Sequence, residues 1–231
     1  MRKIFLCILP VAFVLFLTGC AATPENYGEI KKAKELYEKL DSARVVMVDN
    51  SSGGELMDFR FYINKKDEMI FSYESFENGD RAYSDGVQFF YKTEGDGGWT
   101  AITPNDEAYI YNVYNRKYRY PYARGGLFFL DGTSVSSAKA AEVGGDRLIT
   151  YVYDCDKLND YAATKLDGVS AFSALTCVYR INADGYITEF TETGTMTDDS
   201  DTARDIDLTY RVTEMNGISV IENPVDYVLS E

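Results

Sequence analysis

A period of two in the hydrophobic residues, sustained between residues 46 and 99, constrains the fold of this chain more than any other feature. Successive side chains of a β-strand point to opposite faces, so strict alternation predicts strands that each bury one face. The apolar positions of the two clearest runs are Met57, Phe59, Phe61 and Ile63, followed by Met69, Phe71 and Tyr73. We therefore expect β-sheet through this region.

Turn sequences separate these runs at short intervals. Asn, Asp and Gly dominate them, and these residues favour the tight turns that join adjacent antiparallel strands. The turn sequences are Asn64-Lys65-Lys66-Asp67, Asn78-Gly79, Asp85-Gly86 and Gly95-Asp96-Gly97-Gly98. The region is therefore predicted to form a meander of successive hairpins.

Helices are predicted in three other segments. Residues 26–40 carry apolar side chains at helical intervals and form an amphipathic helix. A second helix is expected to start at Thr103-Pro104, which has a capping residue and a proline at the first helical position, and to be limited by Pro121. Residues 157–165 read as a short helix.

Strands are expected again in the last third of the chain. They are predicted at residues 147–154, 173–181, 186–193, 208–215 and 218–221, with the acidic stretch 197–207 as a solvated loop and Asn216-Gly217 as the last turn. Because strands follow one another in sequence and helices stand apart from them, the fold class is α+β, in a single domain.

Composition excludes several functions. The chain contains no histidine, which removes Ser-His, Cys-His and His-zinc chemistry. Its carboxylates are too numerous for one catalytic pair to stand out, so we expect a protein that is not an enzyme and has no cofactor or metal. A formal net charge of −14 opposes nucleic-acid phosphates, so no nucleic-acid partner is expected.

The N-terminus carries a targeting signal. Met1-Arg2-Lys3 is cationic, and an uncharged apolar run from Ile4 to Leu17 follows it, too short to span a bilayer comfortably. Leu17-Thr18-Gly19-Cys20 then resembles the lipobox of a bacterial lipoprotein. The resemblance implies that Cys20 is diacylated and becomes the mature N-terminus. The alternative is an ordinary signal peptide with a chance cysteine at its end.

This interpretation divides the chain into a signal peptide (1–19), a lipid-anchored tether (20–25) and a folded domain (26–231). Loss of Arg2 and Lys3 with the signal peptide lowers the formal charge to −16. Acyl chains on Cys20, rather than electrostatics, must then hold the protein to its membrane, and two chains suffice for stable anchoring. The predicted location is extracytoplasmic.

Cys155 and Cys177 remain after processing, in a compartment that permits disulfides. They are predicted either to pair or to be two separate buried thiols that behave as small apolar residues.

The order of elements resembles the lipoprotein-carrier superfamily of the LolA and LppX type over residues 30–226. The segments that carry the resemblance are Glu35 to Asp41, Ser84-Asp85-Gly86 leading into Phe89-Phe90-Tyr91, the run Tyr179 to Ile187 leading into Phe190, and Asn223-Pro224-Val225. The resemblance implies an open antiparallel half-barrel closed by helices over an apolar cavity. It also implies a family of lipid or lipoprotein binders, some acting as envelope sensors.

This chain departs from the soluble carrier in two ways. It carries a predicted lipid anchor, and Lys65-Lys66-Asp67 stands where the carrier has a basic residue before a proline, so no lid-locking role is transferred. We expect a membrane-anchored lipoprotein that binds or transfers a lipid or acyl chain, with an envelope protein as a further candidate partner. The alternative is an interaction or sensor module whose half-barrel is filled by its own side chains.

The aromatic residues expected to face inward are the candidate ligand contacts. They are Phe59, Phe61, Phe71, Tyr73, Phe89, Tyr91 and Trp99 from the strands, with Tyr111 and Tyr114 from the inserted helix. The alternative for each is an ordinary core position, since aromatic residues dominate cores generally.

The tyrosine-rich segment 109–124 also carries a basic patch, formed by Arg116, Lys117, Arg119 and Arg124. It is interpreted either as an entrance that meets lipid headgroups or a partner, or as an amphipathic segment whose rings lie on the sheet while its charges are solvated.

Overall fold

The computed structural model describes residues 23–102, 110–165, 171–197 and 202–225, with the side chains of residues 110–112 and 161–165 left out. Cys20 and the predicted signal peptide lie outside this part of the chain. The elements in order are α1 (Tyr27–Tyr37), β1 (Ser42–Asp49), β2 (Gly54–Ile63), β3 (Met69–Ser75), β4 (Arg81–Ser84), β5 (Phe89–Lys92), β6 (Thr100–Ile102), η1 (Ile110–Ala123), β7 (Val135–Val143), β8 (Asp146–Tyr153), α3 (Cys155–Lys165), β9 (Ala171–Ile181), β10 (Ile187–Thr197) and β11 (Ala203–Thr213).

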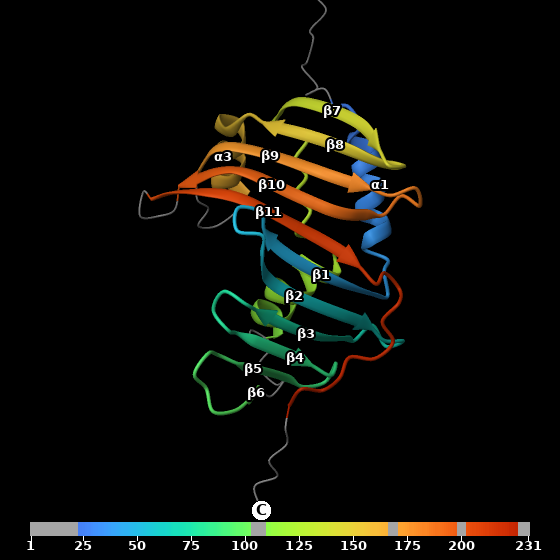
Figure 1. The fold of residues 1–231 in the computed structure, drawn as a ribbon, viewed down its shortest axis with the longest axis vertical. Helices are drawn as coiled ribbons and strands as arrows, with labels where there is room; N and C mark the ends of the chain where they lie inside the picture. The colour runs from blue at the N-terminus through green and yellow to red at the C-terminus, as the bar shows by residue number, and fades with distance from the viewer. Residues whose placement is uncertain (1–22, 103–109, 166–170, 198–201, 226–231) are drawn as a thin grey trace, which may run out of the picture.

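All the described strands join one antiparallel sheet in the order β6-β5-β4-β3-β2-β1-β11-β10-β9-β8-β7 (Figure 1). Strand β11 pairs with β1, so the first and last described strands lie side by side in the middle of the sheet. The sheet begins at β6 and ends at β7 and therefore does not close. This curved, open sheet with helices on one face confirms the predicted half-barrel.

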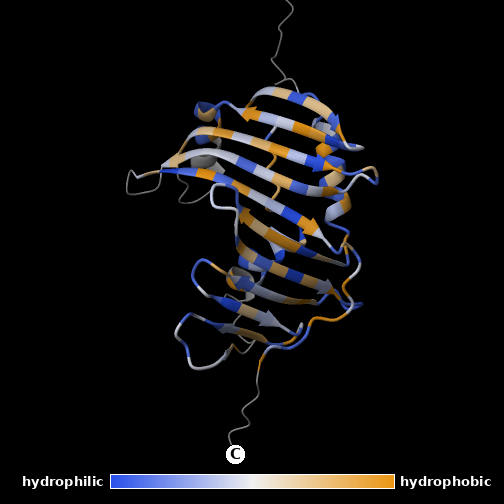
Figure 2. Ribbon diagram, in the orientation of Figure 1, coloured by the Kyte–Doolittle hydropathy of each residue, from blue (hydrophilic) through white to orange (hydrophobic). Residues whose placement is uncertain are grey.

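The predicted alternation determines the register of the sheet. Phe59 lies opposite Val45 on one side and Tyr73 on the other, and Phe61 lies opposite Phe71. Directly paired residues share a face, so these side chains form rows across the sheet. Hydrophobic and polar residues alternate along the strands, as Figure 2 illustrates.

The helices cover the concave face. Helix α1 buries Ile30, Ala33 and Tyr37, whose spacing of three and four residues places them on one helical face. Arg147 of β8 holds the start of this helix: its guanidinium donates to the Asn26 side-chain oxygen (3.2 Å) and lies 3.5 Å from the Glu29 carboxylate. The helix predicted from residues 26–40 is confirmed.

Helix η1 is a π-helix and continues to Ala123, so the prediction that Pro121 limits the segment is wrong. The hydrogen-bond pattern of a π-helix persists to the end of η1. There, the Arg124 backbone amide donates a hydrogen bond to the Arg119 carbonyl (3.0 Å), five residues back. The predicted start at Thr103-Pro104 lies outside the described residues.

Three strand predictions need correction. Residues 218–221 form no strand; they run as an extended tail from the end of β11. Strand β11 starts at Ala203, within the acidic stretch predicted to be a loop, because Ile206 and Leu208 continue the alternation of the strand. Strand β7 was not predicted, since its alanines and serines give little hydrophobic pattern.

None of the helices in the described part of the chain combines the length and the hydrophobicity that a membrane span requires.

Candidate functional site

Helix η1 covers the concave face of β2, β3 and β5. Phe59, Phe61 and Phe71 are completely buried beneath it. Tyr118 of η1 stacks on Phe71 with ring centroids 4.9 Å apart, and Tyr122 lies 4.6 Å from Phe59. In this region the half-barrel is filled by the protein's own rings.

Hydroxyl groups fix the covering segments to the sheet. The Tyr114 hydroxyl accepts from the Met69 amide (3.0 Å) and donates to the Met69 carbonyl (2.9 Å), and burial raises the pKa of this phenol. The hydroxyl of Tyr179 on β9 donates to the Phe129 carbonyl, in the loop that follows η1. The cover is therefore attached by hydrogen bonds as well as by packing.

The loop after η1 covers the other half of the sheet. Phe128 is completely buried and meets Tyr37 and Phe190 edge to face, with centroids 4.8 and 5.9 Å away. The Lys34 ammonium donates to the Phe128 carbonyl, and burial lowers the pKa of this lysine.

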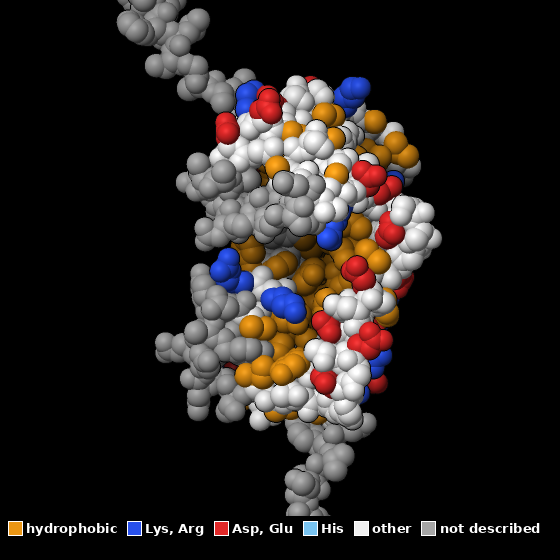
Figure 3. Space-filling view, turned by 90° about the vertical axis from the view of Figure 1, so that its left-hand side faces the viewer, with side chains coloured by type: hydrophobic (Ala, Val, Ile, Leu, Met, Phe, Trp, Pro, Cys, Tyr) orange, Lys and Arg blue, Asp and Glu red, His pale blue; other side chains and the backbone are white. Residues whose placement is uncertain are grey.

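Between the two covered halves, part of the concave face stays partly exposed. We call it the concave groove and define it by six partly exposed residues on this side of the protein: Met47, Leu208, Tyr210, Glu192, Tyr73 and Tyr122. Met47 lies opposite Tyr210 at the β1–β11 junction, and Leu208 lies opposite Glu192. Figure 3 shows apolar side chains gathered in a hollow between the two halves of the molecule.

Glu192 is a carboxylate in these apolar surroundings. Its register neighbours on the concave face are Leu208 and the buried Cys177. Among the described residues it has no hydrogen-bond or ion-pair partner, and burial raises its pKa to about 7. Cys177 lies directly opposite Glu192 on β9, and Tyr210 lies two residues along β11 from its direct partner Leu208. Burial and then the charge of Glu192 raise the pKa of both the Cys177 thiol and the Tyr210 phenol.

Aromatic rings adjoin this carboxylate. Tyr210 stacks on Phe190 with centroids 6.1 Å apart, and its pKa is raised by burial, Glu192 and Tyr122 in that order. Burial, with a smaller contribution from Tyr73, raises the pKa of Tyr122 to about 12. Tyr122 lies 4.6 Å from Phe59, and Tyr73 is the register partner of Phe59, so the phenols of η1 and β3 lie near each other.

Beyond Glu192 along β10, Gly194 lets the backbones of β9 and β10 approach closely. A Cβ at this position would lie 2.1 Å from the Ala174 carbonyl oxygen. Any larger residue there would push the strands apart and deform the sheet beside the groove.

Two smaller pockets flank η1 and share Phe89 and Ile102. One has a volume of about 280 Å³ and is also lined by Tyr91, Lys117 and Tyr118. The other has a volume of about 200 Å³ and lies beside Tyr114 and Arg119.

The predicted ligand contacts separate into groups. Phe59, Phe61, Phe71 and Phe89 are buried, whereas Tyr73 and Tyr91 face the concave side and stay partly exposed. Tyr114 is bound to Met69, and the side chain of Tyr111 lies outside the described residues. As ligand contacts, all of these residues remain predictions.

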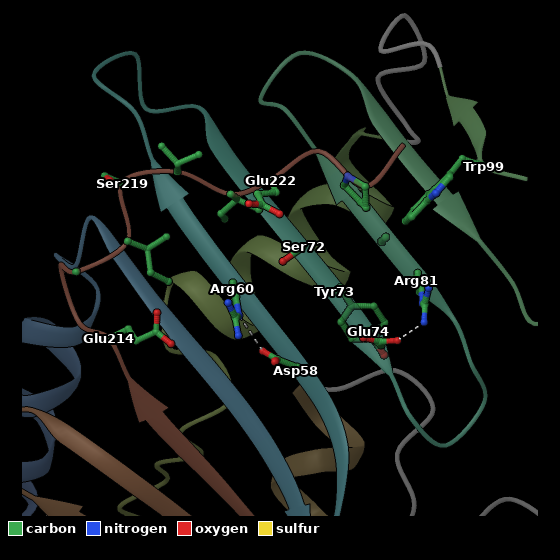
Figure 4. Close-up of a pocket in the computed structure, with 16 residues that line it drawn as sticks. Asp58, Arg60, Ser72, Tyr73, Glu74, Arg81, Trp99, Glu214, Ser219 and Glu222 are labelled. Carbon is green, nitrogen blue, oxygen red and sulfur yellow. Dashed lines mark hydrogen bonds and ion pairs between the residues drawn. The ribbon is translucent and has the colours of Figure 1, made fainter. Parts of the chain in front are cut away.

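Trp99 corrects one prediction, because it does not face inward. It lines a groove of about 650 Å³ on the convex face, between β2–β4 and the tail that runs from Glu214 to Pro224 (Figure 4). Thr100 pairs with Tyr91 on the concave side, so its chain neighbour points the other way.

Four charged side chains that line this convex groove are in ion pairs, whereas Glu214 and Glu222, which also line it, have no ion pair among the described residues. Asp58 lies 2.8 Å from Arg44 and 3.6 Å from Arg60, and Glu74 lies 2.5 Å from Arg81. The groove therefore presents neutralised ion pairs beside Trp99.

The basic segment of η1 follows the amphipathic interpretation. Arg119 and Arg124 lie 2.7 and 2.9 Å from the Asp67 carboxylate, and Arg119 holds the pKa of this acid below its usual range. Lys117 lies over the Tyr118 ring, 5.5 Å from its centroid. These charges connect η1 to the β2–β3 turn while its rings lie on the sheet.

Cys155 and Cys177 are free thiols in this structure; Cys177 is buried, as the second alternative predicted, whereas Cys155 is partly exposed. Cys177 is buried on the concave face of β9, and Cys155 begins α3.

Sequence reasoning missed Glu192. The signal was present: Phe190 is apolar and inward, and alternation places residue 192 on the same face.

No protein-family model and no curated protein matches this sequence. Among solved structures, the crystal structure of LprF from Mycobacterium bovis matches with 12% sequence identity, covering 87% of this chain and 98% of that chain at a TM-score of 0.48.

Proposed function

We propose that this protein is a membrane-anchored lipoprotein that binds an apolar ligand, a lipid or acyl chain, in the concave groove without covalent chemistry. The observation that carries the proposal is the open apolar surface at the β1–β11 junction, formed by Met47, Leu208 and Tyr210. Removing such a surface from water is favourable by roughly 25 cal/mol per Å².

The shape of the site supports a ligand rather than a chance exposure. The groove is concave and mostly apolar, with a single carboxylate among its lining residues, which is the usual composition of a small-molecule site. The neighbouring concave positions are buried by the chain itself, as at Val45 and Phe190. A bound acyl chain would complete the same cover over the groove.

The anchor belongs to the same proposal. Diacylated Cys20 would hold the domain close to the membrane, because few residues separate it from the start of α1 at Tyr27. The ligand would then be held or handed over near the bilayer surface.

The groove is tested with a chain that starts at residue 20, carries Cys20→Ser and retains every described element. It is purified without detergent, and bound lipid is extracted and identified by mass. We expect co-purified lipid in this protein, strongly reduced in Leu208→Trp, whose ring fills the groove. Val152→Trp, an exposed site on β8, is the control and should retain the lipid. Equal lipid in all three proteins, or none in any, would reject the groove.

The anchor is tested on the full chain. Wild type should fractionate with membranes and yield an acylated N-terminal peptide that begins at Cys20, whereas Cys20→Ser should lose both. An unmodified cysteine in the wild-type peptide would remove the anchor from the proposal.

A second function is favoured by a different observation. Because Phe59, Phe61 and Phe71 are fully buried under η1, much of the half-barrel is filled, as expected of an interaction or sensor module. Lipid-free protein that still forms a specific complex with an envelope protein would favour this function.

A further inference from the structure

We infer that the ligand of the concave groove is a cationic amphiphile, an apolar chain with an ammonium end that pairs with the Glu192 carboxylate against the tyrosine rings. This inference rests on the proposed function and specifies the chemical class of its ligand. Its basis is the position of one acid, the rings beside it and the charge of the whole molecule.

The position of Glu192 is the first step. It lies in the middle of β10, on the concave face, between Leu208 and Cys177 in the register of the sheet. A carboxylate in apolar surroundings normally has an ion pair or hydrogen bonds, and Glu192 has neither among the described residues. The ionised acid is therefore a ready partner for a cation from outside the chain.

A second glutamate on β10 differs from Glu192 in having ion-pair partners. Glu189, on the convex face of the same strand, is paired with Arg180 and with Arg211. The chain thus neutralises the outward acid with two arginines and leaves the inward acid without any. An unpaired carboxylate in an apolar groove destabilises the free protein, and a bound cation would offset that cost.

The aromatic residues are the second step. Tyr210 on β11 and Tyr179 on β9 are the diagonal cross-strand neighbours of Glu192. The Tyr122 ring lies 4.6 Å from the ring of Phe59. Ring faces attract ammonium groups, and the attraction grows when the cation is desolvated. An acid flanked by tyrosines is well suited to an ammonium end, while the apolar floor at Met47 accommodates the chain.

The net negative charge of the protein disfavours ligands with an anionic headgroup. The protein carries a formal charge of −14, which disfavours anionic headgroups at a distance. The titratable groups that face Glu192 in the sheet, within the described residues, are Cys177 and Tyr179 on β9 and Tyr210 on β11, and all are neutral near pH 7. A fatty-acid carboxylate beside Glu192 would therefore meet a like charge, because Glu192 has no ion-pair partner among the described residues; the Lys and Arg side chains seen in Figure 3 border the hollow.

Ionisation of the Glu192 carboxyl group makes the expected affinity for an ammonium ligand depend on pH. Only ionised Glu192 pairs with a cation, and in the empty groove burial raises its pKa to about 7. Between pH 6 and pH 8 the ionised fraction rises about tenfold, so affinity for an ammonium ligand should rise by about the same factor.

The test compares probes of one chain length: decylammonium, decanol and decanoate. Their affinities for the lipid-free domain are measured by titration calorimetry at pH 6 and pH 8. At pH 8 decylammonium should bind most tightly and decanoate most weakly. Glu192→Gln should lower decylammonium affinity by about tenfold or more and leave decanol unchanged. Glu142→Gln removes the same charge from exposed β7 and should change nothing.

The outcomes separate the two proposals. If decylammonium and decanol bind equally, with no effect of Glu192→Gln and no pH dependence, the cation inference falls while apolar binding stands. If no probe binds at either pH, the proposed function itself fails. The wild-type pH profile also tests Glu192 without any substitution.

Discussion

Two regions of the concave face differ in how much of their apolar surface is exposed to water. Under η1, Phe59, Phe61 and Phe71 lose all contact with water. At the β1–β11 junction, Met47, Leu208 and Tyr210 occupy equivalent inward positions and stay partly exposed. The same alternation produces both regions, so what distinguishes them is the cover and not the strands. A half-barrel is thus divided into core and candidate site by where its helices and loops lie.

The difference also extends to charge. Under η1, the Tyr114 hydroxyl both donates to and accepts from the Met69 backbone. In the groove, Glu192 has no such partner among the described residues and burial raises its pKa to about 7. The covered region is built for stability, and the groove keeps an unfavourable group that a ligand would neutralise.

Removing the central ring of the cover should have the largest effect. Tyr118 contacts Phe59, Phe71, Tyr73 and Phe89 and is 4% exposed, so Tyr118→Ala should destabilise the domain by about 3–5 kcal/mol. The measurement is urea unfolding. Tyr120→Ala, on the same helix at 65% exposure, is the control and should stay within about 0.5 kcal/mol of wild type. Equal losses in both variants would show that the rings of η1 do not form this core.

Neutralising the groove acid should stabilise the protein. The folded-state pKa of Glu192, about 7, lies above its unfolded value near 4.5, so the native state binds the extra proton and loses stability as pH rises from about 4.5 to 7. At pH 8, Glu192→Gln should therefore be more stable than wild type by up to about 3 kcal/mol, with little difference at pH 4.

Thermal unfolding of the lipid-free domain at both pH values checks this prediction. Glu142→Gln controls for the change in net charge. A destabilising Glu192→Gln at pH 8 would mean that the carboxylate has a stabilising partner in the folded protein.

Two leucines measure the contrast directly. Leu175 is 4% exposed on β9, and Leu208 is partly exposed in the groove. Leu175→Ala should cost about 2–5 kcal/mol, whereas Leu208→Ala should cost about 1 kcal/mol because less of its surface is removed from water on folding. Chemical denaturation of the lipid-free domain gives both values. If Leu208→Ala costs as much as Leu175→Ala, the groove is closed in solution.

The smallest effect on stability is expected at the exposed ion pairs between Asp67 and the two arginines, Arg119 and Arg124. Asp67 pairs with Arg119 and Arg124, but its side chain is 67% exposed. Asp67→Asn should change the unfolding free energy by less than about 1 kcal/mol, and less still at high salt. Unfolding at low and high ionic strength checks this; a large, salt-independent loss would place Asp67 in the core of the cover instead.

The strands were predictable because each buries one face. Phe59 and Phe61 marked β2, and the paired turns marked the hairpins, so the open antiparallel sheet followed from local pattern. The cover was harder to predict. That Tyr118 and Tyr122 would bury Phe59, while Met47 stayed open, depends on the path of η1 across strands distant in sequence.

Other errors have physical causes of the same kind. Trp99 was expected inside because it is large and apolar, yet its position next to Thr100 turns it to the convex groove. Ile218 and Ile221 resemble a strand but run in the tail that borders that groove. Glu192 was overlooked because a single acid among many does not stand out in sequence; its register beside Cys177 makes it distinctive.

The most direct test of apolar binding is the location of a bound chain. A crystal of the lipid-free domain is grown with a bromine-tagged long-chain alcohol, and the anomalous signal of bromine is mapped. We predict bromine density in the concave groove, against Met47, Leu208 and Tyr210. Density confined to the convex groove beside Trp99, or absent from a well-ordered crystal, would contradict the proposed site.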